Sequence, residues 1–149
     1  MKINLLLRTP IIQQKNITLR KILKIIQALN NNHTDQLITQ VIKGIEEVKG
    51  EDIAILDLRK LDNTVSDYFI VCSGSSNTQV DAITNSIKKT ASKALQDKPF
   101  SVEGAENSEW VIMDYINLVV HVFQKQIREY YAIEDLWGDA EITNISTNY

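Results

Sequence analysis

The pattern of hydrophobic and polar positions is clearest in two runs of strand-forming residues, Trp110–Tyr115 and Leu118–Phe123. A short polar break around Asn117 separates the two runs, and this spacing predicts a β-hairpin. Because side chains alternate along a strand, the first run presents two faces, one with Trp110, Ile112 and Asp114 and the other with Val111, Met113 and Tyr115. Both faces carry large apolar groups, so the hairpin is expected inside a sheet rather than at its edge.

The rest of the pattern predicts helices on either side of further strands. Apolar residues between Asp35 and Lys49 recur on one helical face, with Thr34 as the expected N-cap and Gly50 as the expected residue after the helix. A second helix is expected after Ser76, which forms a capping-box pair with Gln79. The other expected elements are strands at Ile53–Arg59, Tyr68–Ser73 and Phe100–Glu103 and a short helix at Gln124–Tyr131. This order predicts one α/β domain, with helices packed on a mixed sheet of about five strands.

Charge is distributed unevenly along the chain. Residues 1–34 contain six of the sixteen Lys and Arg residues and no acid, which leaves ten bases against nineteen acids, or a net charge of −9, in residues 35–149. We expect residues 1–34 to be a loosely ordered basic extension that ends near Asn30–Asn32, residues 35–141 to be the domain, and residues 142–149 to be a tail. An alternative for residues 1–34 is a transit peptide of plastids or mitochondria. An acidic domain repels phosphate backbones, so a protein partner is favoured and sequence-specific binding of nucleic acid is not expected.

Composition narrows the possible chemistry. No apolar run approaches the roughly 20 residues that span a bilayer, so no membrane is expected as a partner. A single cysteine, Cys72, rules out a disulfide within the chain, and its spacing from His33 and His121 fits no metal site. Cys72 is interpreted as a core residue. His121 either lies on a solvated or partner-facing side of the sheet or forms a structural hydrogen bond across the sheet, and the sequence does not separate these two interpretations.

A strand that ends in Gly74-Ser75 before a helix is similar to the corresponding turn of the nucleotidyltransferase fold. Active enzymes of that superfamily hold two metal ions with a pair of carboxylates spaced one residue apart. Here Arg59 stands at that spacing from Asp57, and Ile116 stands at that spacing from Asp114. We therefore expect no catalytic residue, no cofactor and no metal. Convergence of Asp57, Asp67 and Asp114 near Gly74-Ser75 would favour an enzyme instead.

A series of short motifs runs in order through the chain. They are Asp57-Leu58-Arg59, Asp67-Tyr68-Phe69-Ile70-Val71, Ser73-Gly74-Ser75-Ser76, Val102-Glu103-Gly104, Glu109-Trp110-Val111, Asp114-Tyr115, Val119-Val120-His121-Val122-Phe123, Arg128-Glu129-Tyr130-Tyr131 and Leu136-Trp137-Gly138-Asp139-Ala140. Together they resemble the ribosomal silencing factor family, also called Iojap-like, from about Asp35 to Ala140. The resemblance implies a nucleotidyltransferase-like fold without catalytic carboxylates, in a protein of the bacterial cytoplasm.

The resemblance also implies a function. Members of the family bind the large ribosomal subunit through its fourteenth ribosomal protein, block its association with the small subunit and repress translation under nutrient limitation. Alternatives are an assembly factor for the large subunit and, less favoured, a nucleotidyltransferase-like enzyme; a homodimer is a further expected assembly. The residues expected to bind the ribosomal protein are Trp110, Ile112, Asp114, Tyr115, Asn117 and His121.

This chain departs from the family at the tip of the hairpin. The family usually has Asp-Tyr-Gly-Asp there, whereas this chain has Asp114-Tyr115-Ile116-Asn117. Glycine adopts a positive φ at little cost and isoleucine does not. We therefore expect a wider turn in which Asn117 takes the left-handed conformation.

Overall fold

The structure is a computed structural model that describes residues 10–149, with side chains described from residue 18 onward. The elements, in chain order, are α2 (Pro10–Glu47), β1 (Glu51–Asp57), β2 (Tyr68–Gly74), α3 (Asn77–Leu95), β3 (Ser101–Glu103), β4 (Trp110–Asp114), β5 (Leu118–Gln124), α4 (Lys125–Tyr131), α5 (Ile133–Leu136) and β6 (Glu141–Ile145). None of the helices in the described part of the chain combines the length and the apolar character that crossing a bilayer requires.

Helix α2 is continuous from Pro10 to Glu47, so the prediction that a helix begins at Thr34 was wrong. The Thr34 hydroxyl donates to the carbonyl oxygen of Asn30 at 2.9 Å, a bond between successive turns, and therefore does not cap a helix. The helix also runs through Asn30–Asn32, where we expected a boundary. The contacts divide the chain into two units, residues 1–35 and 36–149. The predicted extension lies partly in residues 1–9, outside the described residues, and its separate role stays a prediction.

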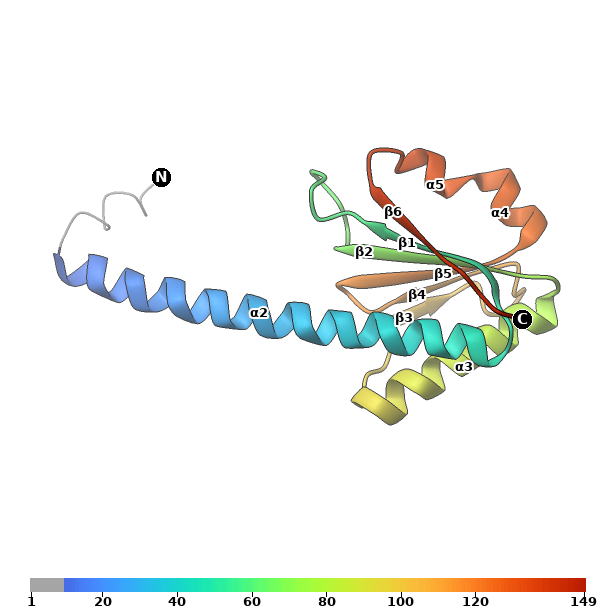
Figure 1. The fold of residues 1–149 in the computed structure, drawn as a ribbon, viewed down its shortest axis with the longest axis horizontal. Coiled ribbons are helices and arrows are strands. Elements are labelled where there is room, and N and C mark those ends of the chain that lie inside the picture. The colour runs from blue at the N-terminus through green and yellow to red at the C-terminus, as the bar shows by residue number, and fades with distance from the viewer. Residues whose placement is uncertain (1–9) are drawn as a thin grey trace. The chain divides into compact units, whose positions relative to one another are not determined.

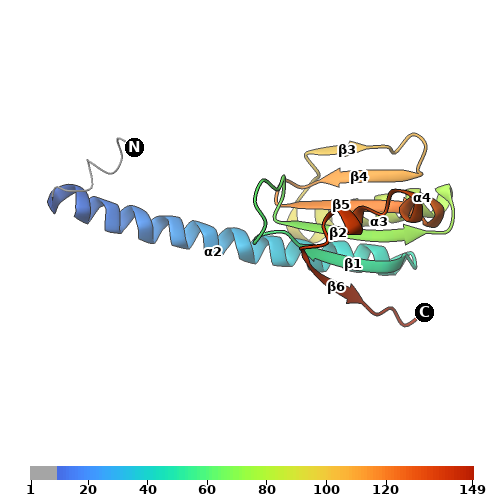
Figure 2. The same ribbon diagram turned by 90° about the horizontal axis from the view of Figure 1, so that it is seen from above.

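The sheet has six strands in the order β3-β4-β5-β2-β1-β6 (Figure 1 and Figure 2). Neighbouring strands are antiparallel except β2 and β5, which are parallel. The β4–β5 hairpin is confirmed, and both of its strands lie inside the sheet. The sheet is therefore mixed, as the order of hydrophobic patterns predicted.

Helices cover the two faces of the sheet in residues 36–149. The part of α2 from residue 36 onward and α3 pack on one face, and α4 and α5 lie on the other (Figure 1). The predicted apolar faces of the two helices are confirmed, because the residues expected on them are buried or partly buried in the core. These residues are Leu37, Ile38, Val41, Ile42, Ile45 and Val48 of α2 and Val80, Ile83, Ile87, Ala91 and Leu95 of α3.

Strand β6 was not predicted, since residues 142–149 were expected to form a tail. It pairs antiparallel with β1, from Ile53 opposite Ile145 to Asp57 opposite Glu141. Most of its side chains are exposed, so the strand leaves no alternating apolar pattern in the sequence. Its position depends on backbone pairing with β1.

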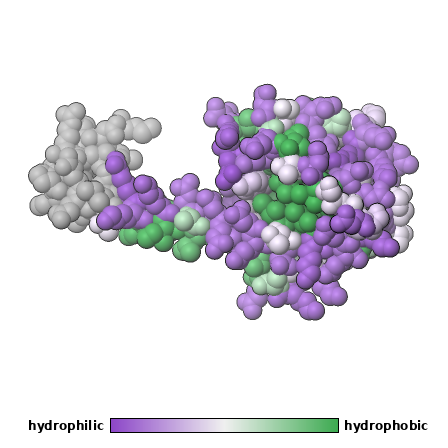
Figure 3. Space-filling model, in the orientation of Figure 1, coloured by the Kyte–Doolittle hydropathy of each residue, from purple (hydrophilic) through white to green (hydrophobic). Residues whose placement is uncertain are grey.

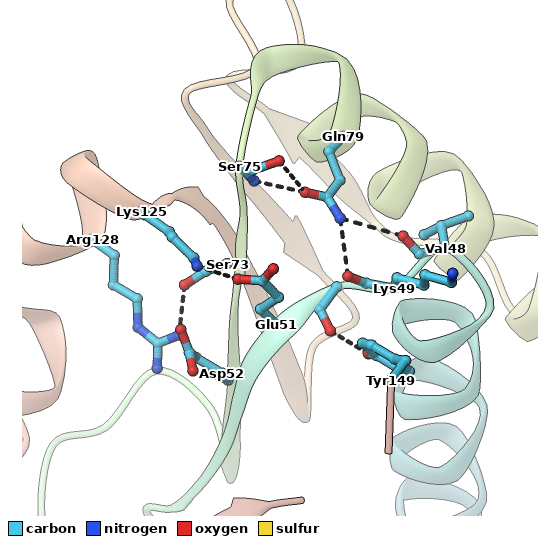
Figure 4. A network of polar contacts seen from close by, with 11 residues as sticks. Val48, Lys49, Glu51, Asp52, Ser73, Ser75, Gln79, Lys125, Arg128 and Tyr149 are labelled. Atoms are coloured by element: carbon cyan, nitrogen blue, oxygen red, sulfur yellow. Dashed lines mark hydrogen bonds and ion pairs between the residues drawn. The ribbon is translucent and has the colours of Figure 1, made fainter. Parts of the chain in front are cut away.

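The start of α3 shows how local sequence fixes an element. The Ser76 hydroxyl accepts a hydrogen bond from the backbone N–H of Gln79 at 3.1 Å, which confirms the expected N-cap. The side chain of Gln79 accepts from the backbone N–H of Ser75 and donates to the carbonyl oxygen of Lys49 (Figure 4). The cap thereby also ties α3 to the segment between α2 and β1.

Candidate functional site

Aromatic rings gather on the face of the sheet that carries α4 and α5. Strands β2, β4 and β5 bring rings together because directly opposite residues point to the same face, as Trp110 does with Phe123. Two further rings come from α4 and from the turn after α5. We call this surface the aromatic face, and it consists of Phe69, Trp110, His121, Phe123, Tyr131 and Trp137.

Trp110 is half-buried at the start of β4. Its ring stacks on Phe123 with the centroids 4.8 Å apart, and its indole N–H donates to Nδ1 of His121 at 3.2 Å. The loop before it approaches closely: Gly104 has a φ of +82°, and a Cβ there would lie 2.0 Å from the carbonyl oxygen of Trp110. The backbone of Trp110 is thus packed against the loop, and its ring contacts Phe123 and His121 while the residue stays partly exposed.

His121 is only 6% exposed, which argues against direct contact with a partner. Burial lowers its pKa to about 4, an effect that the nearby charge of Glu134 partly offsets. A neutral ring that accepts from Trp110 at Nδ1 carries its proton on Nε2, and Nε2 has no partner among the described residues. Of the two interpretations of His121, the structure shows the hydrogen bond across the sheet.

The other residues expected to bind a partner lie on different sides of the hairpin. Ile112 is half-buried on the aromatic face, whereas Tyr115 is 7% exposed and packs in the core beneath α3. Burial raises the pKa of the Tyr115 hydroxyl, with a further contribution from Asp97. Asp114 and Asn117 are half-buried at the tip. The structure thus brings together Trp110, Ile112 and His121 and places Tyr115 on the opposite face.

The tip is a tight turn, and Ile116 rather than Asn117 takes the positive φ, at +74°. The expectations of a wider turn and of a left-handed Asn117 were therefore both wrong. Asp114 stabilises the turn by accepting the Ile116 N–H at 2.7 Å, and the Asn117 carbonyl oxygen accepts the N–H groups of Asp67 and Tyr68. The hydrogen bonds from Asp67 and Tyr68 hold the tip against the start of β2. This tertiary restraint determines that Ile116, rather than Asn117, takes the positive φ.

A polar hollow of about 450 Å³ near the ends of the parallel strands β2 and β5 was not predicted from the sequence. Figure 4 shows residues that line it, among them Ser73, Lys125 and Arg128. At its centre the Arg128 guanidinium donates to the carbonyl oxygen of Asp52 at 2.6 Å and to the Ser73 hydroxyl at 2.9 Å, and it pairs with Glu134. Lys125 pairs with Glu51 at the edge of this hollow. The motif that begins at Arg128 was the only signal in the sequence, and it did not reveal that this side chain ties α4 to β1 and β2.

The geometry does not meet the condition that would favour an enzyme. Asp57, Asp67 and Asp114 lie where β2 and β5 begin, at the opposite end of the sheet from Gly74-Ser75. A bidentate hydrogen bond from Arg59 lowers the pKa of Asp57. In the described part of the chain, no group of three or more His, Cys, Asp or Glu residues could hold a metal ion.

Cys72 also fits a structural role. It is fully buried, and burial raises the pKa of its thiol to about 12, so the thiol stays protonated near neutral pH. Val71 lies opposite His121, so Cys72 points to the other face of the sheet. A cysteine–histidine pair for nucleophilic catalysis is therefore not formed.

Comparison with known proteins identifies the relatives of this chain. Residues 31–148 match the family model described as "Ribosomal silencing factor during starvation". The ribosomal silencing factor of Bacillus subtilis is 41% identical over 101 residues, which cover 67% of this chain and 83% of that protein. The corresponding protein of Halalkalibacterium halodurans is 36% identical over 106 residues, or 70% of this chain and 88% of that protein.

Two further similarities bear on fold and function. A crystal structure of a protein from Chromobacterium violaceum matches with a TM-score of 0.65 at 39% identity and covers 70% of this chain and 85% of that one. A mouse protein named "Mitochondrial assembly of ribosomal large subunit protein 1" is 24% identical over 102 residues, which cover 67% of this chain and 44% of that protein. The match to a solved structure supports the mixed α/β fold described above.

Proposed function

Because the chain belongs to the family of ribosomal silencing factors, we propose that it binds the large ribosomal subunit through the fourteenth ribosomal protein of that subunit. The bound protein blocks association with the small subunit and so represses translation under nutrient limitation, in the cytoplasm of a bacterium. The mechanism is steric: an obstacle on the joining surface is sufficient, and no catalytic group, cofactor or metal takes part.

The observation that carries the proposal is the accessible apolar part of the aromatic face. Helix α4 packs over β2 and β5, which leaves Trp110 and Ile112 on β4 half-exposed. Tyr131 is 50% exposed with its ring 4.9 Å from that of Trp110, and Tyr130 is 81% exposed next to Tyr131. Clustered Trp and Tyr side chains of this kind anchor protein interfaces.

Charge supports a basic protein as the partner. Residues 35–149 carry a net charge of −9, which favours encounter with a basic ribosomal protein and increases the association rate at low salt. Asp114 and Asn117 at the tip contribute polar contacts at the edge of the interface. Tyr115 and His121 are buried, so in this proposal they support the interface without touching the partner.

The proposal is tested by replacing the apolar side chain of Ile112 with a charged one. We expect Ile112→Lys to weaken co-sedimentation with purified large subunits by at least about tenfold, the effect of removing a moderate interface contact. The matched control is Ile142→Lys, which introduces the same side chain at an exposed apolar residue of β6, at the opposite edge of the sheet from β3 and β4. Thermal unfolding of both variants shows whether they are folded. Equal binding by the two folded variants would contradict the proposed surface.

The name of the mouse relative favours a second candidate function, assembly of the large subunit. Mature purified subunits separate the two functions, because an assembly factor acts before the subunit is complete. If the protein prevents mature subunits from joining in sucrose gradients, blocking is supported; if it binds only precursor particles, assembly is supported.

A homodimer would use the same apolar surface, and sedimentation of the free protein with and without Ile112→Lys tests this.

A further inference from the structure

Five lysines gather on the side of residues 36–149 that carries α3 and the end of α2. They line two hollows of about 540 and 420 Å³ that share Lys89. Lys43, Lys89, Lys93 and Lys98 are exposed, and Lys88 is partly exposed. We call this group the lysine patch, and it consists of Lys43, Lys88, Lys89, Lys93 and Lys98.

The lysine patch is not neutralised locally. Other basic side chains of the domain form ion pairs, such as Arg59 with Asp57 and Arg128 with Glu134. Within residues 18–149 no ion pair involves a lysine of the patch, and Glu47 is the one carboxylate among the residues that line the two hollows. Half of the ten Lys and Arg residues of an otherwise acidic domain are thus concentrated on one surface.

Stabilisation of helix α3 does not explain why the five lysines of the patch lie together. A lysine in the last turn stabilises a helix through the helix dipole, and this accounts for Lys93. It does not account for Lys43 on α2 or for Lys98 in the loop before β3. Lys89 and Lys93 are one turn apart, where like charges repel and slightly destabilise a helix. A surface that retains such repulsion is suited to a polyanion.

The chemistry of the hollows favours phosphates. Asn85 and Ser92 line the larger hollow together with lysines, so hydrogen-bond donors accompany the positive charges. Lysine binds phosphate as a mobile point charge, and its flexible side chain can adjust to the position of a phosphate. RNA duplexes are recognised largely through backbone phosphates and 2′-hydroxyls, without a sequence code.

The lysine patch lies close to the proposed protein interface. Val102 of β3 lines the larger hollow, and β3 pairs with β4, where Glu103 is opposite Ile112. Ile112 lies on the same side of the sheet as the aromatic face, so one edge of the sheet carries the proposed protein-binding surface on one side and the lysine patch on the other. A ribosomal protein embedded in RNA offers both kinds of partner at such an edge.

We propose that the lysine patch binds the phosphate backbone of ribosomal RNA beside the protein partner, so that attachment to the large subunit uses two surfaces. This inference rests on the proposed function, because that function supplies the subunit. The negative charge of the whole domain does not prevent the contact, since screening limits the reach of exposed charges to about 8 Å at physiological ionic strength. Binding is independent of sequence and falls as salt increases.

The test compares two double variants that remove the same charge. Lys89→Gln/Lys93→Gln alters the lysine patch, and Lys49→Gln/Lys60→Gln alters exposed lysines elsewhere. Affinity for purified large subunits is measured by sedimentation at 50 to 300 mM salt, and affinity for a bare RNA duplex by fluorescence anisotropy at low salt. At about 100 mM salt, each phosphate contact contributes roughly five- to eightfold, so we expect a loss of about 25- to 60-fold for the patch variant. Its salt dependence should become shallower by about one to two units of slope, and the control should bind like the parent.

Each outcome bears on a separate claim. If the parent binds subunits and the patch variant binds them equally well with the same salt slope, the inference is wrong and the proposed function stands. If both double variants lose affinity alike, net charge rather than the lysine patch is responsible, which also overturns the inference. If the parent does not bind subunits, the proposed function is wrong. The comparison of parent and patch variant on the RNA duplex then tests whether the lysine patch binds RNA. Displacement by polyglutamate but not by RNA duplex would indicate an acidic protein instead.

Discussion

At the scale of single residues, burial determines the chemistry of His121. The imidazole accepts a hydrogen bond from Trp110 and packs edge-on against Phe69 with the centroids 4.8 Å apart. Protonation would remove the acceptor and place a charge among aromatic rings. The folded state therefore stabilises the neutral ring, which is the physical meaning of its lowered pKa.

A pH dependence of stability follows. The pKa of His121 is about 4 in the folded state and about 6.5 when unfolded, so the unfolded state binds the proton first as pH falls. The contribution to the free energy of unfolding should be constant above about pH 7 and fall by about 3 kcal/mol between pH 6.5 and pH 4. Chemical denaturation across this range measures the loss.

Two variants separate this effect from other titrations. His121→Phe, although less stable at neutral pH, should lack the loss of stability that His121 causes between pH 6.5 and pH 4. His33→Gln replaces an exposed histidine and should retain it. If His121→Phe and the parent lose stability in parallel from pH 6.5 to pH 4, then His121 is not the group responsible.

At the scale of elements, the β4–β5 hairpin is strained at its turn. Ile116 is β-branched, 64% exposed and held at a φ of +74°, a conformation that costs an L-residue about 1–2 kcal/mol. The bonds from Asp67 and Tyr68 to the Asn117 carbonyl oxygen keep the tip in place despite this cost. Contacts between the hairpin and the start of β2 therefore override the preference of the turn residue.

Replacing the strained residue should stabilise the protein. Glycine at position 116 removes the steric cost but increases the freedom of the unfolded chain, so Ile116→Gly is expected to raise the free energy of unfolding by about 0.5–1 kcal/mol. Asn117→Gly is the control, because Asn117 does not have a positive φ and glycine there should destabilise by a similar amount. Thermal and denaturant unfolding measure both. A destabilised Ile116→Gly variant would show that the isoleucine side chain stabilises the tip.

At the scale of the whole molecule, the described core begins in the later part of α2, about two thirds of the way along the helix. Thr34 and Leu37 are the first buried side chains along the described residues, whereas apolar residues before them are exposed on the helix (Figure 3). The exposed residues include Leu19, Ile22, Leu23, Ile25, Ile26 and Leu29. The core of residues 36–149 therefore draws its helical face from the second part of α2.

Removal of residues 1–33 should leave a folded domain that still binds large subunits. We expect the free energy of unfolding to change by less than about 1 kcal/mol, because the described side chains of this segment, those of residues 18–33, are all exposed. Removal of residues 1–41 also deletes Leu37 and Val41, which are 2% and 0% exposed, and should cost at least about 3 kcal/mol. Thermal unfolding and sedimentation with subunits test both truncations. Loss of folding or binding in the shorter truncation would assign residues 1–33 to the domain.

Several features of the fold could be predicted from the sequence because they depend on neighbours along the chain. The hairpin, the inward faces of α2 and α3 and the Ser76 cap follow from alternation, helical periodicity and one side-chain hydrogen bond. The ordered motifs also identified the family, which the comparisons confirm. For the candidate site, Trp110 and Ile112 could be placed on one face of β4 by alternation alone.

The tertiary structure decided what depends on contacts between distant segments. Parallel pairing of β2 with β5 and the addition of β6 to β1 leave no periodic pattern, because backbone hydrogen bonds between strands carry no side-chain signature. The lysine patch likewise joins α2, α3 and the loop before β3. His121 illustrates the same limit: its strand was predictable, but its burial came from Trp110 and Phe69 on neighbouring strands. Alternation sets the face of a side chain, whereas only packing of the whole chain decides whether that face meets solvent.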